Sequence, residues 1–222
     1  MKTIIVLLVL FNGLASFAQI RTFIEADYTS KIDSMRKEWG QNKSNISPKY
    51  ELPILIALSY YPELKNAHID FKEQKIKTSM NAQPTLGSIL FRKKDNWHFT
   101  VRINNQEKDS MVHVSQVPFN ALVGVFGHEF YHFMDYKTKK PGHFLGFLFK
   151  YMSKKGKKKV EYYTDLGTIK RGLGWQCYDF EHYVQHVSKA TVAYKKFKAE
   201  TYLSAEQILE EMKKLEMYGI IP

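Results

Sequence analysis

The chain has almost no cysteine. Cys177 is the only one among 222 residues, so the chain cannot form an internal disulfide. The fold must therefore rest on its own hydrophobic core, with a bound metal as one further source of stability. No catalytic motif surrounds Cys177, and we interpret it as a buried structural thiol rather than a nucleophile.

The chain also lacks an apolar run long enough to span a bilayer. A short apolar stretch, 4–11, follows the positive charge of Lys2, and small side chains precede Gln19. This order is typical of a signal peptide and predicts that residues 1–18 are removed on export to the periplasm or the medium. The alternative is that the stretch forms a buried first helix of the mature fold.

Acidic residues are scarcer than basic ones, 22 against 33, which gives a net charge of +11. Such an excess attracts anionic surfaces, although a solvated lysine-rich face is the simpler interpretation. The segment from Phe144 to Lys159 combines an apolar run with a cluster of five lysines at 154–159 and is a candidate contact with an anionic surface or a membrane. The alternative for this segment is a lid or insertion loop. Because stacking aromatic residues do not alternate with the lysines, we expect no nucleic-acid partner.

Periodicity predicts helices and strands in the first half of the chain. Apolar side chains recur every three or four residues in 21–39, and a compact apolar segment spans 50–61, so we expect a helix in each. β-branched and aromatic residues predict strands further on, and strict alternation makes the last of these half-buried. The strands are expected at 68–80, 88–92 and 97–104, and Asp95 with Asn96 predicts a hairpin between the last two.

Two helices are expected near the C-terminus, at 175–197 and 204–218. Ser204 and Gln207 have the spacing of a capping box at the start of the second one. No repeat or linker divides the chain. We therefore expect residues 19–222 to form one domain of the α+β class, with a small mixed sheet and a mainly helical C-terminal part.

The most informative stretch begins at His128. His128 and His132 are four residues apart in an apolar segment, so on a helix both imidazoles lie on one face and reach the same ion. Glu129 lies one step around the helix, where its carboxylate can reach a water molecule beside that ion. This H-E-x-x-H pattern is typical of zinc hydrolases, in which the glutamate is the general base. We therefore predict one Zn²⁺ ion per chain, with Glu129 as the catalytic residue.

A catalytic zinc site needs a third protein ligand, which must come from another segment. A histidine six residues after His132 is excluded, because Thr138 stands there. Glu161 and Asp165 are instead spaced to share one face of a later helix. We predict that Glu161 is the third ligand and that Asp165 accepts a hydrogen bond from the distal nitrogen of a ligating histidine. The alternative is that Asp165 itself binds the metal.

The H-E-x-x-H motif followed by Glu161-x-x-x-Asp165 resembles the gluzincin metallopeptidases, the clan of thermolysin. The resemblance covers roughly residues 68–190 and rests on these two motifs. It implies a zincin-like fold, in which a sheet with an antiparallel edge strand packs on the H-E-x-x-H helix. It also implies hydrolysis of a peptide or protein substrate, and we expect strand 97–104 to be the edge that pairs with this substrate.

The resemblance further implies a side chain that donates a hydrogen bond to the scissile carbonyl, usually Tyr or His in this clan. The downstream candidates are Tyr178, His182, Tyr183 and His186. His182 and His186 form a second pair four residues apart, which we interpret as packing or surface residues because no glutamate follows the first. A different hypothesis is a catalytically inactive zincin-fold protein that binds polyanions or an anionic membrane through its basic surface. The presence of Glu129 argues against it.

Overall fold

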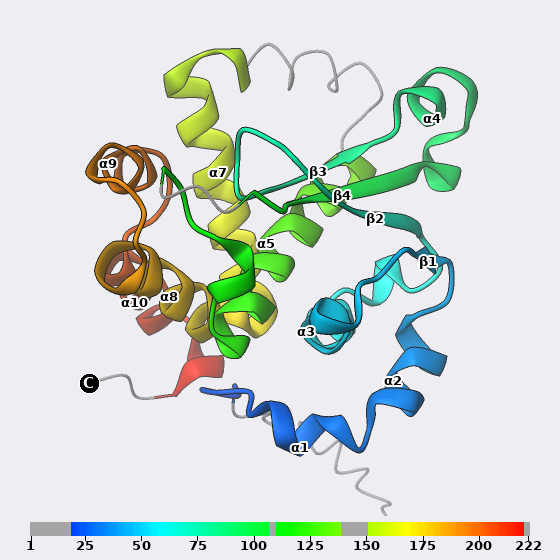
Figure 1. The fold of residues 1–222 in the computed structure, drawn as a ribbon, viewed down its shortest axis with the longest axis horizontal. Coiled ribbons are helices and arrows are strands. Elements are labelled where there is room, and N and C mark those ends of the chain that lie inside the picture. The colour runs from blue at the N-terminus through cyan, green and yellow to red at the C-terminus, as the bar shows by residue number, and fades with distance from the viewer. Residues whose placement is uncertain (1–18, 107–109, 139–150, 220–222) are drawn as a thin grey trace, which may run out of the picture.

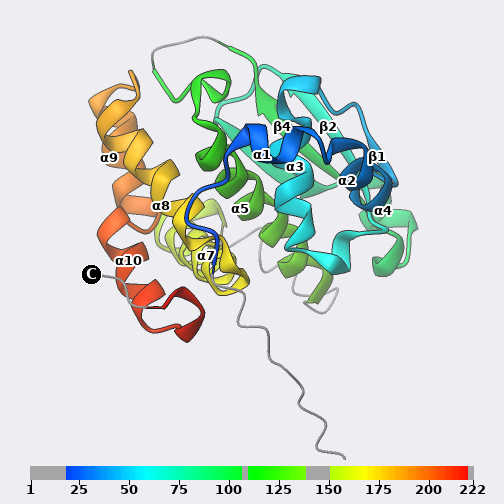
Figure 2. The ribbon, with the colours of Figure 1, turned by 90° about the horizontal axis from the view of Figure 1, so that it is seen from below.

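A computed structural model describes residues 19–106, 110–138 and 151–219 of this α+β protein (Figure 1). As expected from the sequence, it has a small mixed sheet and a mostly helical C-terminal part. Figure 2 shows the long helix α5 (Phe119–Thr138) between the sheet and the C-terminal helices. No helix in the described ranges is long and apolar enough to cross a membrane.

The N-terminal residues form two short helices instead of one. α1 (Glu25–Thr29) and α2 (Ile32–Trp39) replace the single helix predicted over 21–39, with a break at Ser30. Neither helix contains a fully buried residue, since their apolar side chains only border the core. Packing therefore does not require one continuous helix. α3 (Pro48–Ser59) is buried over most of its length and confirms the helix predicted over 50–61.

Four strands form the sheet in the order β1-β2-β4-β3. β1 (Lys43–Ser44), β2 (His68–Gln74) and β4 (His98–Asn104) are parallel, and β3 (Met80–Pro84) runs antiparallel to β4. The strand predicted over 68–80 is thus divided, because the chain leaves the sheet after Gln74 and returns as β3 on the far side of β4.

The prediction that strand 97–104 is the sheet edge is wrong. It forms β4, which lies between β2 and β3, and the antiparallel edge is β3. The alternation that predicted a half-buried strand is also misleading here. Thr100 and Asn104, on the polar face, are buried like Val101 on the apolar one. Both faces of β4 are therefore covered, as is usual for an inner strand.

The segment predicted as a strand over 88–92 is instead the helix α4 (Leu86–Phe91), so the predicted hairpin is wrong as well. Thr85 caps this helix, and its hydroxyl accepts a hydrogen bond from the backbone N–H of Ser88 at 3.4 Å. Phe91 is exposed, and Ser88 is the buried residue of α4. A strand over this segment would therefore bury no apolar face, and the cap at Thr85 favours a helix.

The C-terminal part of the described chain is a series of helices. They are α7 (Lys154–Thr168), the π-helical turn η4 (Ile169–Leu173), α8 (Gly174–His182), a second π-helical turn η5 (Tyr183–Val187), α9 (Val192–Thr201) and α10 (Ala205–Lys213). The single helix predicted over 175–197 is interrupted before α9, where Ser188 is extended and Thr191 caps the new helix. The predicted capping box of Ser204 and Gln207 is confirmed, but α10 ends at Lys213 rather than at 218.

The lysine cluster belongs to a helix rather than to a loop. Lys154 is the first residue of α7, and the side chain of Ser153 caps it by accepting a hydrogen bond from the N–H of Gly156 at 3.0 Å. The predicted lid or insertion loop is therefore wrong for residues 154–159. The preceding residues 144–150 of the predicted surface segment lie outside the described residues.

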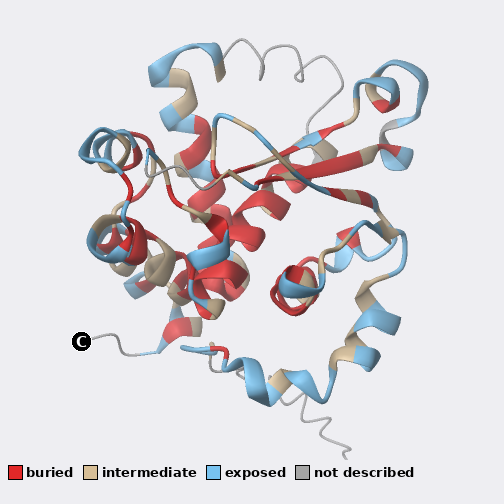
Figure 3. Cartoon of the chain, in the orientation of Figure 1, coloured by how far each residue is buried: buried red, intermediate tan, exposed pale blue. Residues whose placement is uncertain are grey.

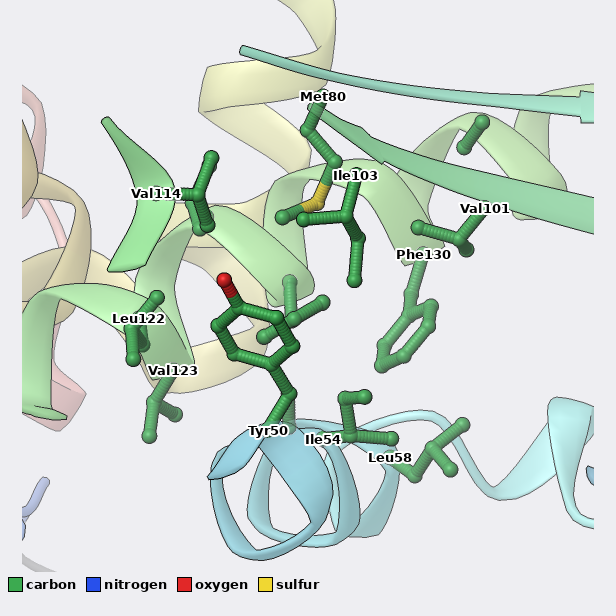
Figure 4. Packing of buried hydrophobic residues seen from close by; sticks show 14 of the residues in the cluster. Tyr50, Ile54, Leu58, Met80, Val101, Ile103, Val114, Leu122, Val123 and Phe130 are labelled. Atoms are coloured by element: carbon green, nitrogen blue, oxygen red, sulfur yellow. The ribbon is translucent and has the colours of Figure 1, made fainter. Parts of the chain in front are cut away.

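Helix α5 is at the centre of the hydrophobic core, and Figure 3 shows it buried along most of its length. It contacts α3 and β3 on one side and α7 and α8 on the other. Figure 4 shows Phe130 of α5 between Val101 of β4 and Leu58 of α3. The hydroxyl of Tyr61 donates a buried hydrogen bond of 2.6 Å to the carbonyl of Gly127. These contacts set the rotation of α5 and so decide which of its side chains face α7.

Helices α5 and α8 approach so closely that an added Cβ does not fit at position 124. A Cβ on Gly124 would lie 2.4 Å from the carbonyl oxygen of Gln176. We expect Gly124→Ala to lower the free energy of unfolding by about 1–3 kcal/mol, because the two helix backbones must separate. Urea unfolding measures the change. Gly87→Ala is the matched control and should cause no loss, since among the described residues nothing beyond its chain neighbours lies within 4 Å of the added Cβ. An unchanged midpoint for Gly124→Ala would contradict this helix contact.

Candidate metal centre

Two helices bring three potential metal ligands together. α5 presents His128 and His132 from successive turns, and α7 presents Glu161 opposite them. Their ligating atoms all lie within 4.8 Å of one another. A Glu161 oxygen, Oε2, is 3.1 Å from Nε2 of His128 and 3.5 Å from Nε2 of His132. All three side chains are buried, with residue exposures of 8%, 5% and 1% in chain order. Such a group could hold a metal ion.

The two helices pack closely because α7 has glycine where it meets α5. A Cβ on Gly167 would fall 1.9 Å from the ring of Tyr131, so the ring occupies the space that a side chain would need. Gly167 follows Glu161 by six residues, and Tyr131 precedes His132 directly. This close packing allows the short carboxylate of Glu161 to reach between the two histidines.

Hydrogen bonds orient both imidazoles. Nδ1 of His128 is 2.8 Å from Oδ1 of Asp165, while Oδ2 of Asp165 accepts a bond from the backbone N–H of Leu203 at 3.0 Å. Nδ1 of His132 is 3.3 Å from the hydroxyl of Thr164, which donates its own proton to the carbonyl of Val160 at 3.1 Å. Each Nδ1 is thus engaged as a donor, which leaves each Nε2 directed at Glu161.

The positions of Asp165 and Glu161 distinguish their roles. Asp165 contacts the ring nitrogen of His128 that faces away from Glu161, so its geometry is that of an orienting residue rather than a third ligand. Thr164 plays the corresponding part for His132, and sequence analysis missed it. Its position three residues after Glu161, on the same helix face, is the signal that could have indicated it.

Hydrogen bonds between His128 and the neighbouring carboxylates shift the pKa values of His128 and Glu161 in opposite directions. Burial alone would lower the pKa of His128, but hydrogen bonds to Asp165 and Glu161 outweigh it and raise this pKa to about 10. Burial alone would raise the pKa of Glu161, but its hydrogen bonds to His128 and His132 lower it well below its usual range. At neutral pH the site therefore holds an imidazolium beside a carboxylate, and a cation takes the place of the imidazolium proton when it binds.

We expect zinc binding at pH 7 to release about one proton, because His128 must be neutral to act as a ligand. The affinity should rise about tenfold per pH unit up to the His128 pKa of about 10. The stability of the protein without metal should depend on pH in the opposite direction to the zinc affinity. The raised pKa of His128 contributes stability that is complete below the ordinary imidazole value of 6.5 and is lost as the pH rises through about 10. Calorimetry in buffers of different ionisation enthalpy counts the proton. A pH-independent affinity would contradict this account of the site.

Glu129 lies beside the triad, and one of its carboxylate oxygens is left without a partner by the described residues. Its Oε2 is buried and has no hydrogen-bond partner within the described part of the chain. Burial raises the pKa of Glu129, an effect that the nearby His132 and His128 partly offset. A buried carboxylate oxygen without a partner is costly in a folded protein unless a ligand or water completes it. The orphaned oxygen and the His₂Glu donor set together fit a metal site with a water molecule beside the ion.

The site opens on a cleft formed by two neighbouring cavities. One, of about 440 Å³, runs along β3 and is lined by Asn81, Gln83, Tyr136 and Tyr151 among others. The other, of about 290 Å³, is lined by residues of α5, α8 and α9. Both cavities share His128 and Glu129, so they meet at the candidate metal centre.

The candidate donors to a scissile carbonyl are not brought to this cleft. None of Tyr178, His182, Tyr183 and His186 lines either of these two cavities. The ring of Tyr178 instead stacks on that of His182, and His182 in turn contacts His186. These side chains gather on the α8–η5 segment rather than opposite Glu129.

Two other tyrosines lie at the site. The hydroxyl of Tyr151 donates a hydrogen bond to Glu161, and the ring of Tyr202 is 5.7 Å from that of His128. Tyr202 directly precedes Leu203, whose N–H holds Asp165, so the same backbone contact positions both. Sequence analysis missed both tyrosines, because neither has a fixed spacing from the motifs. Only packing of distant segments brings them in.

No protein-family model, curated protein or solved structure matches this chain. The function must therefore be argued from the geometry of the site.

Proposed function

We propose that this protein is a zinc metallopeptidase of the gluzincin type with a zincin-like fold. The observation that carries the proposal is the buried triad of His128, His132 and Glu161 with the Oε2 of Glu129 beside it, which has no hydrogen-bond partner among the described residues. Two histidines and a glutamate form a donor set that catalytic zinc uses, with one position left open. The alternative of Asp165 as third ligand has less support, since its carboxylate is already engaged by His128 and Leu203.

The chemistry divides among groups of the chain. A zinc ion held by the triad would lower the pKa of a water molecule and polarise a carbonyl group. Glu129 serves as general base, because its free Oε2 can accept the proton of the attacking water and pass it to the leaving amine. Asp165 and Thr164 hold the two histidines in the tautomer that binds a cation. Tyr202 lines both cavities beside His128 and is our candidate for the donor to the scissile carbonyl oxygen, since the hydroxyl of Tyr151 already donates to Glu161.

The edge of the sheet supports a peptide as substrate. β3 is the last strand in the sheet order and borders the larger cavity from Met80 to Pro84. Its outer backbone groups can pair with an extended chain, which is a common way to bind peptides without regard to their side chains. The substrate-pairing role expected for β4 therefore passes to β3. We also propose export to the periplasm or the medium, for which the N-terminal sequence is the support.

The test is whether peptide hydrolysis depends on bound zinc. The chain from Gln19 onward, freed of metal by chelation, should cleave no member of a mixed peptide library, and added zinc should restore cleavage that mass spectrometry can locate. The same preparation should bind about one zinc per chain at the triad. If the zinc-loaded protein cleaves no peptide, or if cleavage is indifferent to chelation, the proposed function is wrong.

A further inference from the structure

The smaller cavity contains a lysine that the proposed reaction does not use. Lys198 comes from α9 and lines this cavity together with Glu129 and His128. The lysine is buried, with 7% of its surface exposed, although lysine is almost always found at the protein surface. A buried ammonium beside a catalytic centre calls for a physical account.

Aromatic rings make the direct contacts with the ammonium of Lys198, although Glu129 and Glu181 line the same cavity. Its Nζ lies 3.2 Å from the ring centroid of Tyr202 and 5.3 Å from that of Phe180. Cation–π contacts of this kind stabilise a charge without using its N–H donors. Within the described residues no carboxylate makes an ion pair with Lys198 and no acceptor takes a hydrogen bond from it, so these donors can serve a ligand in the cavity.

Besides Glu129, which the proposed reaction uses as a base, two acids line the same wall, and both are already engaged. Oε1 of Glu181 accepts a hydrogen bond from Gln185 at 2.9 Å, and burial raises the pKa of Glu181, an effect that the charge of Lys198 partly offsets. Asp165 is held by His128 and Leu203. Lys157 also lines the cavity, with its Nζ 4.7 Å from the ring of Phe197. The pocket therefore offers positive charge together with apolar ring surface.

The cavity lies at a defined end of the cleft. It reaches Thr78 and Met80 at the start of β3, whereas the larger cavity follows β3 to Pro84 and on to Leu86 and Ile89 of α4. Figure 1 shows α9 and α4 at opposite ends of this strand. A peptide that pairs with β3 and passes Glu129 would enter the smaller cavity on one side of the bond that is cut.

We propose that Lys198 makes this cavity a subsite for a carboxylate of the substrate, on the α9 side of the scissile bond. This inference rests on the proposed peptidase function and adds a substrate class to it. The ammonium would pair with the anion, and the rings of Phe180, Phe197 and Tyr202 would pack on the apolar part of the same residue. The carboxylate belongs either to the C-terminus of the peptide or to an Asp or Glu side chain.

The test compares peptides that differ only in this charge. Equilibrium binding is measured on a zinc-loaded Glu129→Gln background, so that hydrolysis does not interfere. One probe pair is dansyl-Ala-Ala-Phe-Leu as free acid and as C-terminal amide. The second pair is dansyl-Ala-Ala-Phe-Glu amide and dansyl-Ala-Ala-Phe-Gln amide. We expect the acid of at least one pair to bind about 10- to 100-fold more tightly than its neutral partner, and the pair that shows this identifies the source of the carboxylate.

Variants of α9 then assign the preference to one side chain. Lys198→Met should abolish the preference for the acid, and Lys198→Arg should retain much of it because the charge is kept. Lys196→Met is the matched control, since Lys196 lies on the same helix but is exposed and pairs only weakly with Glu200 at 3.9 Å. It should leave the preference unchanged. Circular dichroism checks that each variant is folded.

The outcomes separate this proposal from the one it rests on. Equal binding of acid and neutral peptides by the Glu129→Gln protein, or a preference that survives in Lys198→Met, overturns the role of Lys198 even if peptides are cleaved by the wild type. If Lys198→Met does not fold, binding of the probe pairs to the parent protein and to Lys198→Arg still shows whether the preference for the acid exists and whether it persists when the charge is kept. Failure of the proposed function shows differently, as a wild-type protein that cleaves neither acid nor amide in the presence of zinc.

Discussion

Replacing Glu129 with glutamine is expected to lower kcat by about a hundred- to ten-thousand-fold while the zinc content stays at the wild-type level. The amide has the volume of the carboxylate but cannot accept a proton from the attacking water. Glu129 does not belong to the group of residues whose atoms converge as ligands, so the ion should keep all its protein contacts. Steady-state kinetics and elemental analysis of the same preparation measure both quantities.

The free Oε2 of Glu129 makes this variant informative about the fold as well. A buried oxygen without a partner contributes no stabilising hydrogen bond, so Glu129→Gln should be at least as stable as the wild type toward urea. Glu200→Gln, an exposed residue of α9, is the control for the loss of one acidic group. Activity that persists in Glu129→Gln, or zinc that is lost from it, would contradict the assignment of Glu129 as general base.

The part of the site that local geometry determines could be predicted from the sequence. His128 and His132 face one way on any helix, because four residues make little more than one turn. Glu161 and Asp165 follow the same rule on α7, and the structure brings both to His128. What joins the two pairs is helix packing, which depends on Gly167 and Tyr131 and has no local pattern.

Strand order could not be predicted in the same way. A strand's own residues show which side chains alternate, but they do not show which strands lie on either side of it. Buried polar residues such as Thr100 mimic a solvent face, so the alternation in β4 predicts a half-buried strand although both faces are covered. The true edge, β3, ends in Pro84, a residue that is tolerated at sheet edges because it lacks an N–H donor.

The start of helix α7 could not be predicted from the sequence because it lies within the lysine cluster. Cations in the first turn of a helix oppose its dipole, so Lys154 and its neighbours are unfavourable at the start of α7. The second half of α7 has the opposite tendency, since Val160, Glu161 and Thr164 are buried against the rest of the molecule. The cap supplied by Ser153 then allows the helix to start within the charged run. Tertiary packing outweighs a surface electrostatic term of a few tenths of a kcal/mol to about 1 kcal/mol.

Removal of the Glu161 carboxylate is expected to abolish stoichiometric zinc binding. Glu161→Gln keeps the side-chain volume but removes the anionic ligand that faces both Nε2 atoms. Asp165→Asn should weaken zinc binding by only about 10- to 100-fold, because Asp165 acts through Nδ1 of His128 and not on the ion. Competition with a chromophoric chelator at fixed pH measures both affinities.

The order of the two effects decides which carboxylate is the third ligand. Asp165 also holds the N–H of Leu203, so Asp165→Asn should lower the stability of the metal-free protein. Among the described residues the Glu161 carboxylate bonds only side chains, so Glu161→Gln should cost less stability. Thermal unfolding without metal separates that structural cost from lost ligation. If Asp165→Asn loses zinc while Glu161→Gln retains it, the third ligand is Asp165, and Glu161 becomes the residue that only orients the histidines.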